Sequence, residues 1–332
     1  MRMIDLRSDT VTRPSAEMLA CMTSAETGDD VYGEDPTVNR LEALAAEMAG
    51  KESGLFVTSG TQGNLLALLA HCQRGDEYIA GHEAHTYKFE GGGAAVLGGI
   101  QPQPVAFNEC GELPLTDIEA VIKPDDVHFA RTRLLCLENT TGGKVLSMDY
   151  LAAFSAFADE RGLAKHLDGA RVFNAAVKLA LPVSDIAQHF DSVSICLSKG
   201  LATPAGSVLV GSRSLIDEAR KWRKMVGGGM RQAGVIAAAG IYALEHHIDR
   251  LAEDHDSASR FAEGVSQLER ISVKPPETNM VMVETDKFAE LSRFLAENDV
   301  RVSSPRFVFH RDIASSDVEI LIDLVRRFDQ NA

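Results

Sequence analysis

The chain has 332 residues, of which 45% are hydrophobic and 24% charged, a composition typical of a globular protein with a large core. Its formal net charge of −15 disfavours nucleic acid and anionic membrane surfaces as partners. Five widely spaced cysteines without a CxxC pair argue against a disulfide framework or a zinc site, and there is no signal-like or membrane-spanning apolar run, so we expect a cytoplasmic protein.

The chain opens with two polar segments of little periodicity, residues 5–14 and residues 28–36. Such segments either decorate the surface or line a site. The first helix is predicted to begin after Asp35, which has the residue type of an N-cap, with Pro36 in its first position. Gly50 suits the end of this helix.

A predicted strand over residues 54–58 leads into a turn rich in glycine and hydroxyl groups, residues 59–64, and then into a helical run. Such a turn can bind an anion, because free amides and the helix dipole both point at the ligand. Simple capping by Ser59 or Thr61 is the alternative. The turn is neither a Walker loop nor a G-x-G-x-x-G motif, which argues against a nucleotide.

Two histidines, His82 and His85, and Glu83 follow a predicted strand over residues 77–80. A metal site is disfavoured here, because side chains from one strand alternate between its two faces. We favour instead an aromatic platform or a proton shuttle at the end of the strand.

Strands and helices continue to alternate through the middle of the chain. Residues 116–119 have the pattern of a capping box and predict a helix that ends near residue 123. His128 lies in the connection to a strand over residues 134–138. Ser147 is predicted to cap the next helix, which ends at Gly162.

An aspartate and a lysine follow two successive predicted strands. Asp168 comes after the run of residues 163–167, and ligands of α/β sheets bind at the carboxyl ends of strands. One predicted helix and a strand over residues 191–197 then lead to Lys199. A buried lysine loses its proton readily and forms Schiff bases with carbonyls, although a lysine that reaches from a strand end into water has the same pattern.

The alternation predicts an α/β protein with a mostly parallel sheet and helices on both faces. After the glycines of residues 227–229, an alanine-rich run over residues 232–269 is predicted to be a long helix that bridges to a second unit. That unit is predicted to contain strands at 279–284 and 306–309, and helices at 287–297 and from Ser316 onward. We therefore divide the chain into a large cofactor-binding unit, residues 1–245, and a small C-terminal α/β unit, residues 246–332.

Three features thus occur in one chain order: an anion-binding turn, a carboxylate at a strand end, and a lysine after the next strand. The chemistry of pyridoxal 5'-phosphate (PLP) needs each of them. Amides at a helix N-terminus suit the phosphate, Asp168 can keep the pyridine nitrogen protonated, and Lys199 can carry the aldehyde carbon. A nicotinamide dehydrogenase is disfavoured, because the glycine fingerprint is absent.

The ordered set resembles the low-specificity L-threonine aldolases of the β-eliminating lyase superfamily, which are fold-type I PLP enzymes, along essentially the whole chain. The stretches that carry the resemblance are residues 5–12, 28–36, 59–62, 167–171, 194–200 and 227–232. The resemblance implies a seven-stranded-type sheet with helices on both faces and a small C-terminal domain. It also implies a homotetramer with active sites at the subunit interfaces.

Site residues follow from the resemblance position by position. It implies that the cofactor is held by Gly60, Thr61, His85, Asp168, Arg171, Lys199, Lys224 and Arg231, the last two from across a subunit interface. It implies that the substrate is held by Ser8, Tyr32, His128, Arg171 and Arg306. No metal is expected. The sequence departs from the family at Thr141, where histidine is usual, and the segment before Arg306 is short.

The reaction implied is cleavage of L-threonine, L-allo-threonine and other L-β-hydroxy-α-amino acids to glycine and an aldehyde, with Lys199 and Asp168 catalytic. The base that takes the hydroxyl proton is His85, His128 or an ordered water. The alternatives are another fold-type I PLP enzyme, either a β-eliminating lyase or an aminotransferase, and a non-catalytic binding protein of the same fold. A second reading of Arg231 is a surface arginine without a role in the site.

Overall fold

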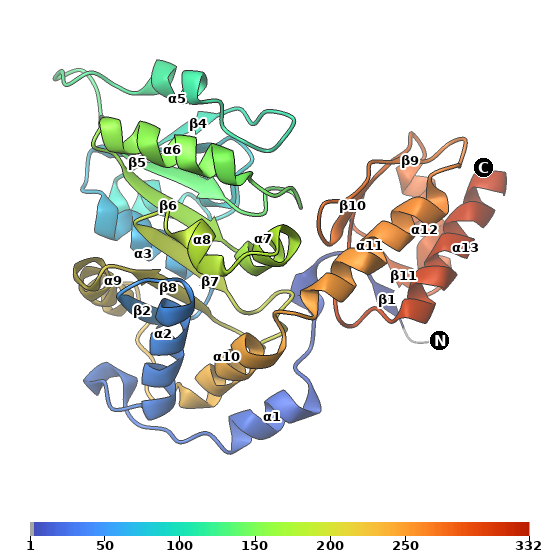
Figure 1. Ribbon diagram of the computed structural model, residues 1–332, viewed down its shortest axis with the longest axis horizontal. Coiled ribbons are helices and arrows are strands. Elements are labelled where there is room, and N and C mark those ends of the chain that lie inside the picture. The colour runs from blue at the N-terminus through green and yellow to red at the C-terminus, as the bar shows by residue number, and fades with distance from the viewer. Residues whose placement is uncertain (1–2, 332) are drawn as a thin grey trace.

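The computed structural model describes residues 3–331, which form a larger unit built on one sheet and a smaller C-terminal unit (Figure 1). The strands of the large sheet are β2 (Ser53–Val57), β3 (Asp76–Gly81), β4 (Gln101–Val105), β5 (Arg131–Glu138), β6 (Ala164–Gly169), β7 (Ser192–Cys196) and β8 (Ser207–Gly211). Their order is β2-β8-β7-β6-β5-β3-β4, and all pairs are parallel except the two that β8 makes. The predicted mostly parallel, seven-stranded sheet is confirmed.

Helices cover both faces of this sheet. In the larger unit they are α1 (Ala16–Thr23), α2 (Pro36–Met48), α3 (Gly60–His71), α4 (His85–Lys88), α5 (Leu115–Val121), α6 (Met148–Glu160), α7 (Val172–Leu179), α8 (Val183–Ala187), α9 (Arg213–Met225) and α10 (Gly234–His246). A short helical turn, η1 (Asp9–Val11), precedes α1, and two more, η2 (Asp30–Tyr32) and η3 (Ala94–Gly98), lie between later helices.

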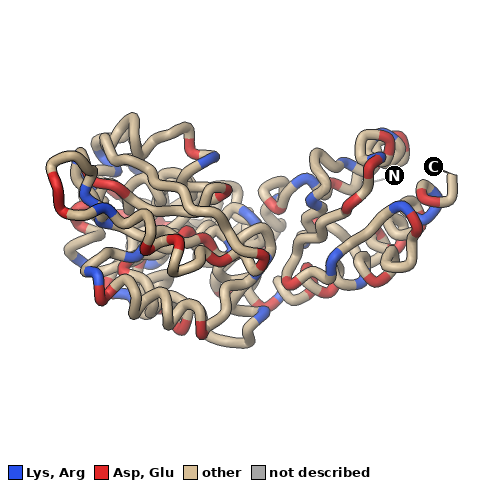
Figure 2. The backbone as a smooth tube through the Cα atoms, turned by 90° about the horizontal axis from the view of Figure 1, so that it is seen from above, with Lys and Arg blue, Asp and Glu red and all other residues tan. Residues whose placement is uncertain are grey.

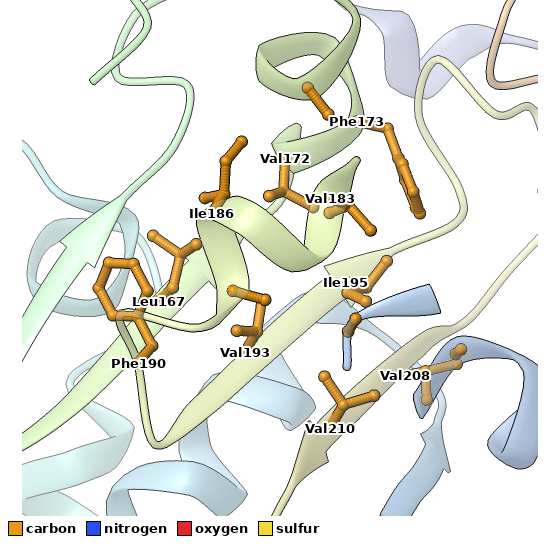
Figure 3. Packing of buried hydrophobic residues seen from close by; sticks show 14 of the residues in the cluster. Leu167, Val172, Phe173, Val183, Ile186, Phe190, Val193, Ile195, Val208 and Val210 are labelled. Carbon is orange, nitrogen blue, oxygen red and sulfur yellow. The ribbon is translucent and has the colours of Figure 1, made fainter. Parts of the chain in front are cut away.

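Successive side chains of a strand point to opposite faces of the sheet, which explains why an apolar core lies on each face. Phe56 of β2 faces the core formed with α2, α6, α7 and α8, whereas its neighbours Leu55 and Val57 face α3 and α9. Figure 3 shows the first of these cores, where Val193 and Ile195 of β7 lie beneath side chains of α7 and α8. Burial of apolar side chains on both faces fixes the sheet, and its carboxyl edge is left for polar groups.

The smaller unit has its own apolar core. It contains α11 (Leu251–Val265), β9 (Ser272–Val273), β10 (Met280–Glu284), α12 (Phe288–Glu297), β11 (Val300–Arg301), β12 (Arg306–Val308) and α13 (Ser315–Asn331). The N-terminal strand β1 (Ile4–Asp5) pairs in parallel with β11, and Ile4 and Leu6 are buried in this core. The division at residue 245 stays a prediction, but residues 4–6 pack with the C-terminal unit, as the position of β1 in Figure 1 shows.

Several local predictions are confirmed by the helix ends. The side chain of Asp35 accepts the backbone N–H groups of Thr37 and Val38, with Pro36 in the first helical position, and Ser147 caps α6. Acidic and basic residues are interspersed over both units (Figure 2). Within residues 3–331, no helix is both long and apolar enough to cross a membrane.

Three local predictions are wrong. The run over residues 232–269 forms two helices, α10 and α11, and His247 between them bonds through Nδ1 to the carbonyl oxygen of Leu201. Two helices, α7 and α8, connect β6 to β7 where one was predicted, because Ala180 takes a left-handed conformation that ends α7. The expected capping box is absent from α5, which starts at Leu115 directly after Pro114.

Candidate active site

The carboxyl ends of β5, β6 and β7 bring the central polar groups to one edge of the sheet. Glu138 of β5 and Asp168 of β6 are partners in the parallel register, so the two carboxyl groups lie side by side. Lys199 follows β7, and the N-terminus of α3 lies above the same edge, where Gly60 approaches Cys196 and Ser207. The structure therefore brings together the predicted turn, the predicted carboxylate and the predicted lysine.

Asp168 is held as a fixed, buried carboxylate. Its Oδ1 accepts the backbone N–H of Ala170 at 3.0 Å, and its Oδ2 accepts a hydrogen bond from Nδ2 of Asn64 at 2.8 Å. One donor on each oxygen fixes the plane of this carboxylate. Asp168 is thus suited to pair with a cationic ring nitrogen.

His85 begins α4 and is fixed at both ends. Its backbone N–H donates to Oε2 of Glu138 at 2.9 Å, and its Nδ1 lies 2.8 Å from Oε1 of Glu90. The hydrogen bond to Glu90 raises the pKa of His85, and burial raises the pKa of Glu90. Glu90 therefore orients the imidazole ring of His85 and shares a proton with it.

Polar atoms of His85, Glu90 and Asp168 lie within 4.8 Å of one another, a spacing that could suit a metal ion. The Asn64 amide already donates to an oxygen of each carboxylate, at 2.8 Å in both cases. These oxygens would have to give up their donors to bind a cation. The absence of a metal stays a prediction.

The surroundings of Glu138 favour the protonated form of its carboxyl group. Burial, with the neighbouring charge of Asp168, raises the pKa of Glu138 to about 7. A carboxyl group of this kind can take up or release a proton near neutral pH.

The N-terminal polar segment is part of this edge and does not merely decorate the surface. The hydroxyl of Thr12 donates to the backbone oxygen of Lys199 at 2.8 Å. Asp9 accepts two hydrogen bonds from Arg171, from Nε at 2.7 Å and from Nη2 at 2.6 Å. Burial alone would raise the pKa of Asp9, but Arg171 outweighs it and the pKa is lowered.

Two arginines of this region, Arg171 and Arg306, form an electropositive pair. Burial, and next the charge of Arg171, lower the pKa of Arg306. Within the described residues, the buried Nε of Arg306 has no hydrogen-bond partner. Ser8, the serine predicted to bind the substrate together with these arginines, accepts the backbone N–H of Thr10 through its hydroxyl oxygen. Two guanidinium groups with an unused donor suit a carboxylate ligand.

The turn before α3 is built as an anion cradle. Ser59 caps the helix by accepting the N–H of Gln62, which leaves the first two amides, of Gly60 and Thr61, without a partner in the helix itself. The hydroxyl of Ser207 is buried without a hydrogen-bond partner in the described chain, and it lies 3.7 Å from where a Cβ on Gly60 would stand. Capping by Ser59 therefore leaves the amides of Gly60 and Thr61 available to an anion.

Four predicted residues lie on the surface of the chain. His128 is 79% exposed and bonds to Asp126, and Tyr32 is 76% exposed. Lys224 is exposed, and Arg231 is 54% exposed and forms an ion pair with Asp29 at 2.9 Å. Within residues 3–331, no hydrogen bond or ion pair links them to Lys199 or Asp168.

Sequence reasoning missed four residues that the structure places in the site: Asp9, Asn64, Glu90 and Glu138. Asp9 and Asn64 stand inside the polar segment and the turn that the sequence singled out. Glu138 ends a strand, as Asp168 does, and this position was the available signal. Nothing in the sequence distinguishes Glu90, which precedes three glycines.

Comparison with solved structures assigns the class of this fold. The threonine aldolase of Leishmania major matches with a TM-score of 0.84 and 22% identity, over 98% of this chain and 99% of that one. The match shows that this chain has the fold-type I architecture that the sequence predicted.

Comparison with sequences assigns the family. A family model described as β-eliminating lyase matches residues 5–287. The low specificity L-threonine aldolase of Escherichia coli (strain K12) is 54% identical over 317 residues, which cover 94% of this chain and 95% of the relative. Low-specificity L-threonine aldolase 1 of Arabidopsis thaliana is 44% identical, with coverages of 96% and 94%. The chain belongs to the β-eliminating lyase family, which confirms the predicted resemblance.

Proposed function

We propose that this protein is a PLP-dependent lyase that cleaves L-threonine, L-allo-threonine and related L-β-hydroxy-α-amino acids to glycine and an aldehyde. The observation that carries the proposal is the convergence of Lys199, Asp168 and the amide-lined turn at Gly60 on one sheet edge. The names and high identity of the relatives supply the substrate class.

The residues at this edge fit PLP. Lys199 would hold its aldehyde carbon, Asp168 its pyridine nitrogen, and the amides of Gly60 and Thr61 its phosphate. The orphaned Ser207 hydroxyl beneath the turn supports a phosphate there. When bound, PLP supplies an electron sink for the electron pair of a bond broken at Cα.

Arg171 and Arg306 bind the substrate carboxylate in this proposal. Asp9 holds two of the five N–H donors of Arg171, so the guanidinium keeps a fixed plane and offers its remaining donors. Anchoring the carboxylate sets which bond to Cα stands perpendicular to the ring. Orientation of this kind contributes on the order of several kcal/mol to catalysis.

The hydroxyl proton of the substrate needs an acceptor, for which the candidates are His85, His128 and a water. His85 is better supported than His128, because its ring lies in the site and its Nδ1 is bonded to Glu90. In neutral His85, Nδ1–H donates to Glu90 and Nε2 is free to accept a proton. Glu138, with its pKa of about 7, can also take up or release a proton in the site near neutral pH.

A homotetramer with shared sites belongs to the same proposal. Tyr32 and Met225 are large hydrophobic side chains that are mostly exposed in the single chain, near Lys224 in the last turn of α9 and Arg231 in the segment after it. Exposed side chains of this kind are expected at subunit contacts. A cytoplasmic location is supported by the five cysteines, all of which are described and free.

The test is to incubate the purified protein with L-threonine and, separately, with L-allo-threonine in the presence of PLP. We expect glycine and acetaldehyde in equal amounts, and none of either from Lys199→Ala. Ammonia with an oxo acid would point to an eliminating lyase, and amine transfer to an added oxo acid would point to an aminotransferase. Either result without glycine would overturn the proposal.

A further inference from the structure

Behind Asp168 a single buried amide joins the two carboxylates of the site. Asn64 of α3 is 1% exposed. Its Nδ2 donates to Oδ2 of Asp168 and to Oε1 of Glu90, each at 2.8 Å, and its Oδ1 lies 3.1 Å from Nε2 of His166. All three polar positions of the amide are used, and Glu90 in turn holds His85.

A chain of neutral groups continues from Asn64 into the protein. Nδ1 of His166 lies 2.8 Å from the hydroxyl of Ser192, and the same hydroxyl lies 2.8 Å from Nε2 of His71. Burial lowers the pKa of His166 to about 3 and that of His71 to about 4, so both rings are neutral at pH 7. Neutral rings give each nitrogen a single role, either donor or acceptor.

The roles along this chain follow from its carboxylate end. Carboxylates accept, so the NH₂ group of Asn64 must face Asp168 and Glu90, and its oxygen must face His166. His166 therefore carries its proton on Nε2, and its Nδ1 accepts the hydroxyl proton of Ser192. The oxygen of Ser192 then accepts from Nε2–H of His71. Each donor meets one acceptor, and the amide of Asn64 has one allowed orientation.

An amide at position 64 can donate a hydrogen bond to each of two neighbouring carboxylates. Two carboxylates within 4.8 Å repel each other, and both need hydrogen-bond donors because both are largely buried. Asparagine supplies two N–H donors without a charge and without a proton to lose. Aspartate in its place would offer at most one donor.

We propose that Asn64 is a positioning residue that holds the carboxylate of Asp168 in place and couples its orientation to that of Glu90 and His85, with His166 fixing the Asn64 amide. The inference rests on the proposed function for the identity of the cofactor. The hydrogen bond from Asn64 fixes Oδ2 of Asp168, as the N–H of Ala170 fixes Oδ1, so the carboxylate would face the pyridine nitrogen of bound PLP in one orientation. Removing the donor would let this carboxylate turn, and the ring nitrogen of bound PLP would lose part of the partner that keeps it protonated.

The first measurement needs no cofactor. Imidazole ¹⁵N shifts in the cofactor-free protein report the tautomer of His166, and we expect Nε2–H. An Nδ1–H tautomer would mean that Asn64 turns its NH₂ group toward His166, and it would overturn the inference. This result does not depend on whether the protein binds PLP or cleaves threonine, so the network and the proposed function can fail separately.

The second measurement uses PLP labelled with ¹⁵N in its ring, bound to the wild type, Asn64→Asp and Asn64→Ala. We expect a pyridinium shift in the wild type and a displacement toward neutral pyridine in both variants, with PLP dissociation constants raised by about tenfold, or ~1.4 kcal/mol. His166→Phe should cause a smaller displacement in the same direction. Asn279→Ala is the matched control, since buried Asn279 donates to the backbone oxygen of Phe309 and to no carboxylate.

Unchanged ring ¹⁵N shifts and PLP affinities in both Asn64 variants would overturn the inference. A displacement in Asn279→Ala equal to that in Asn64→Ala would also overturn it, because the effect would then come from general loosening of the fold. Failure of the wild type to bind PLP would refute the proposed function and leave the tautomer result standing.

Discussion

Replacing Asp9 by asparagine isolates the electrostatic contribution of the N-terminal segment to the site. Asp9 is fully buried and the side chain of Arg171 is 10% exposed, and the two make two hydrogen bonds of 2.6 and 2.7 Å. Asparagine keeps the size of the side chain but removes the charge, so the guanidinium is left buried without its counter-ion.

The expected loss is large because the pair is buried. Removing one partner of a buried, hydrogen-bonded ion pair costs roughly 3–5 kcal/mol, and we expect about 3 kcal/mol because one oxygen remains as an acceptor. The Asp9→Asn substitution would also leave Arg171 free to rotate, so the KM for L-threonine should rise more than kcat falls. Denaturant unfolding of the cofactor-free protein, followed by circular dichroism, measures the first effect, and steady-state kinetics measures the second.

Asp5→Asn is a matched control in the same segment. Asp5 also forms a bidentate pair, with Arg7 at 2.6 and 2.9 Å, but Arg7 is exposed to solvent. Exposed ion pairs contribute about 0–1 kcal/mol, so this variant should unfold close to the wild type. If Asp9→Asn lost no more stability than Asp5→Asn, burial could not be the source of the strength of the Asp9–Arg171 pair.

Three further predictions follow from the same contacts. Glu138→Gln should flatten the pH dependence of kcat/KM around its pKa of about 7, and an unchanged profile would assign that ionisation to another group. Burial lowers the pKa of His166 to about 3, so the stability that the neutral ring contributes is present above the unfolded pKa of 6.5 and is lost as the pH falls. At about pH 5 this loss in the free energy of unfolding is ~2 kcal/mol. His166→Phe should remove that part of the difference between the free energies of unfolding measured at pH 7 and at pH 5. Arg231→Ala should raise the dissociation constant of PLP measured by equilibrium dialysis. Arg40, another exposed arginine in an ion pair, is the control, and Arg40→Ala should leave that constant unchanged. Equal dissociation constants for the two variants would mean that Arg231 is a surface residue without a role in cofactor binding.

Much of the fold could be predicted because local patterns determine it. Apolar runs buried on both faces marked the parallel strands, and Asp35 with Pro36 and Ser147 marked helix starts that the structure reproduces. The single helix predicted from residues 232–269 was wrong. Its composition favours helix throughout, but α10 ends at His246, α11 begins at Leu251, and the side chain of His247 between them bonds to the backbone oxygen of Leu201. This contact with another part of the chain has no signal in the local composition.

The site could be predicted only as far as single residues carry a signal. Asp168 and Lys199 follow strands, and the turn at Gly60 precedes a helix, so their positions alone suggested a common edge. The network behind them joins Asn64 of α3, His166 of β6 and Ser192 of β7, and Asn64 and His166 are 102 positions apart and meet only in the folded sheet. Tyr32 and His128 illustrate the converse, since both were predicted to lie near the substrate and both are mostly exposed in the described chain.

The most direct test of the proposed function is to locate the lysine that holds the cofactor. The protein would be incubated with PLP, reduced with borohydride, digested, and mapped by mass spectrometry. We predict a single phosphopyridoxyl group on the peptide that contains Lys199, and no such group in Lys199→Ala. Attachment to a different lysine, or none in the wild type, would contradict the role of Lys199.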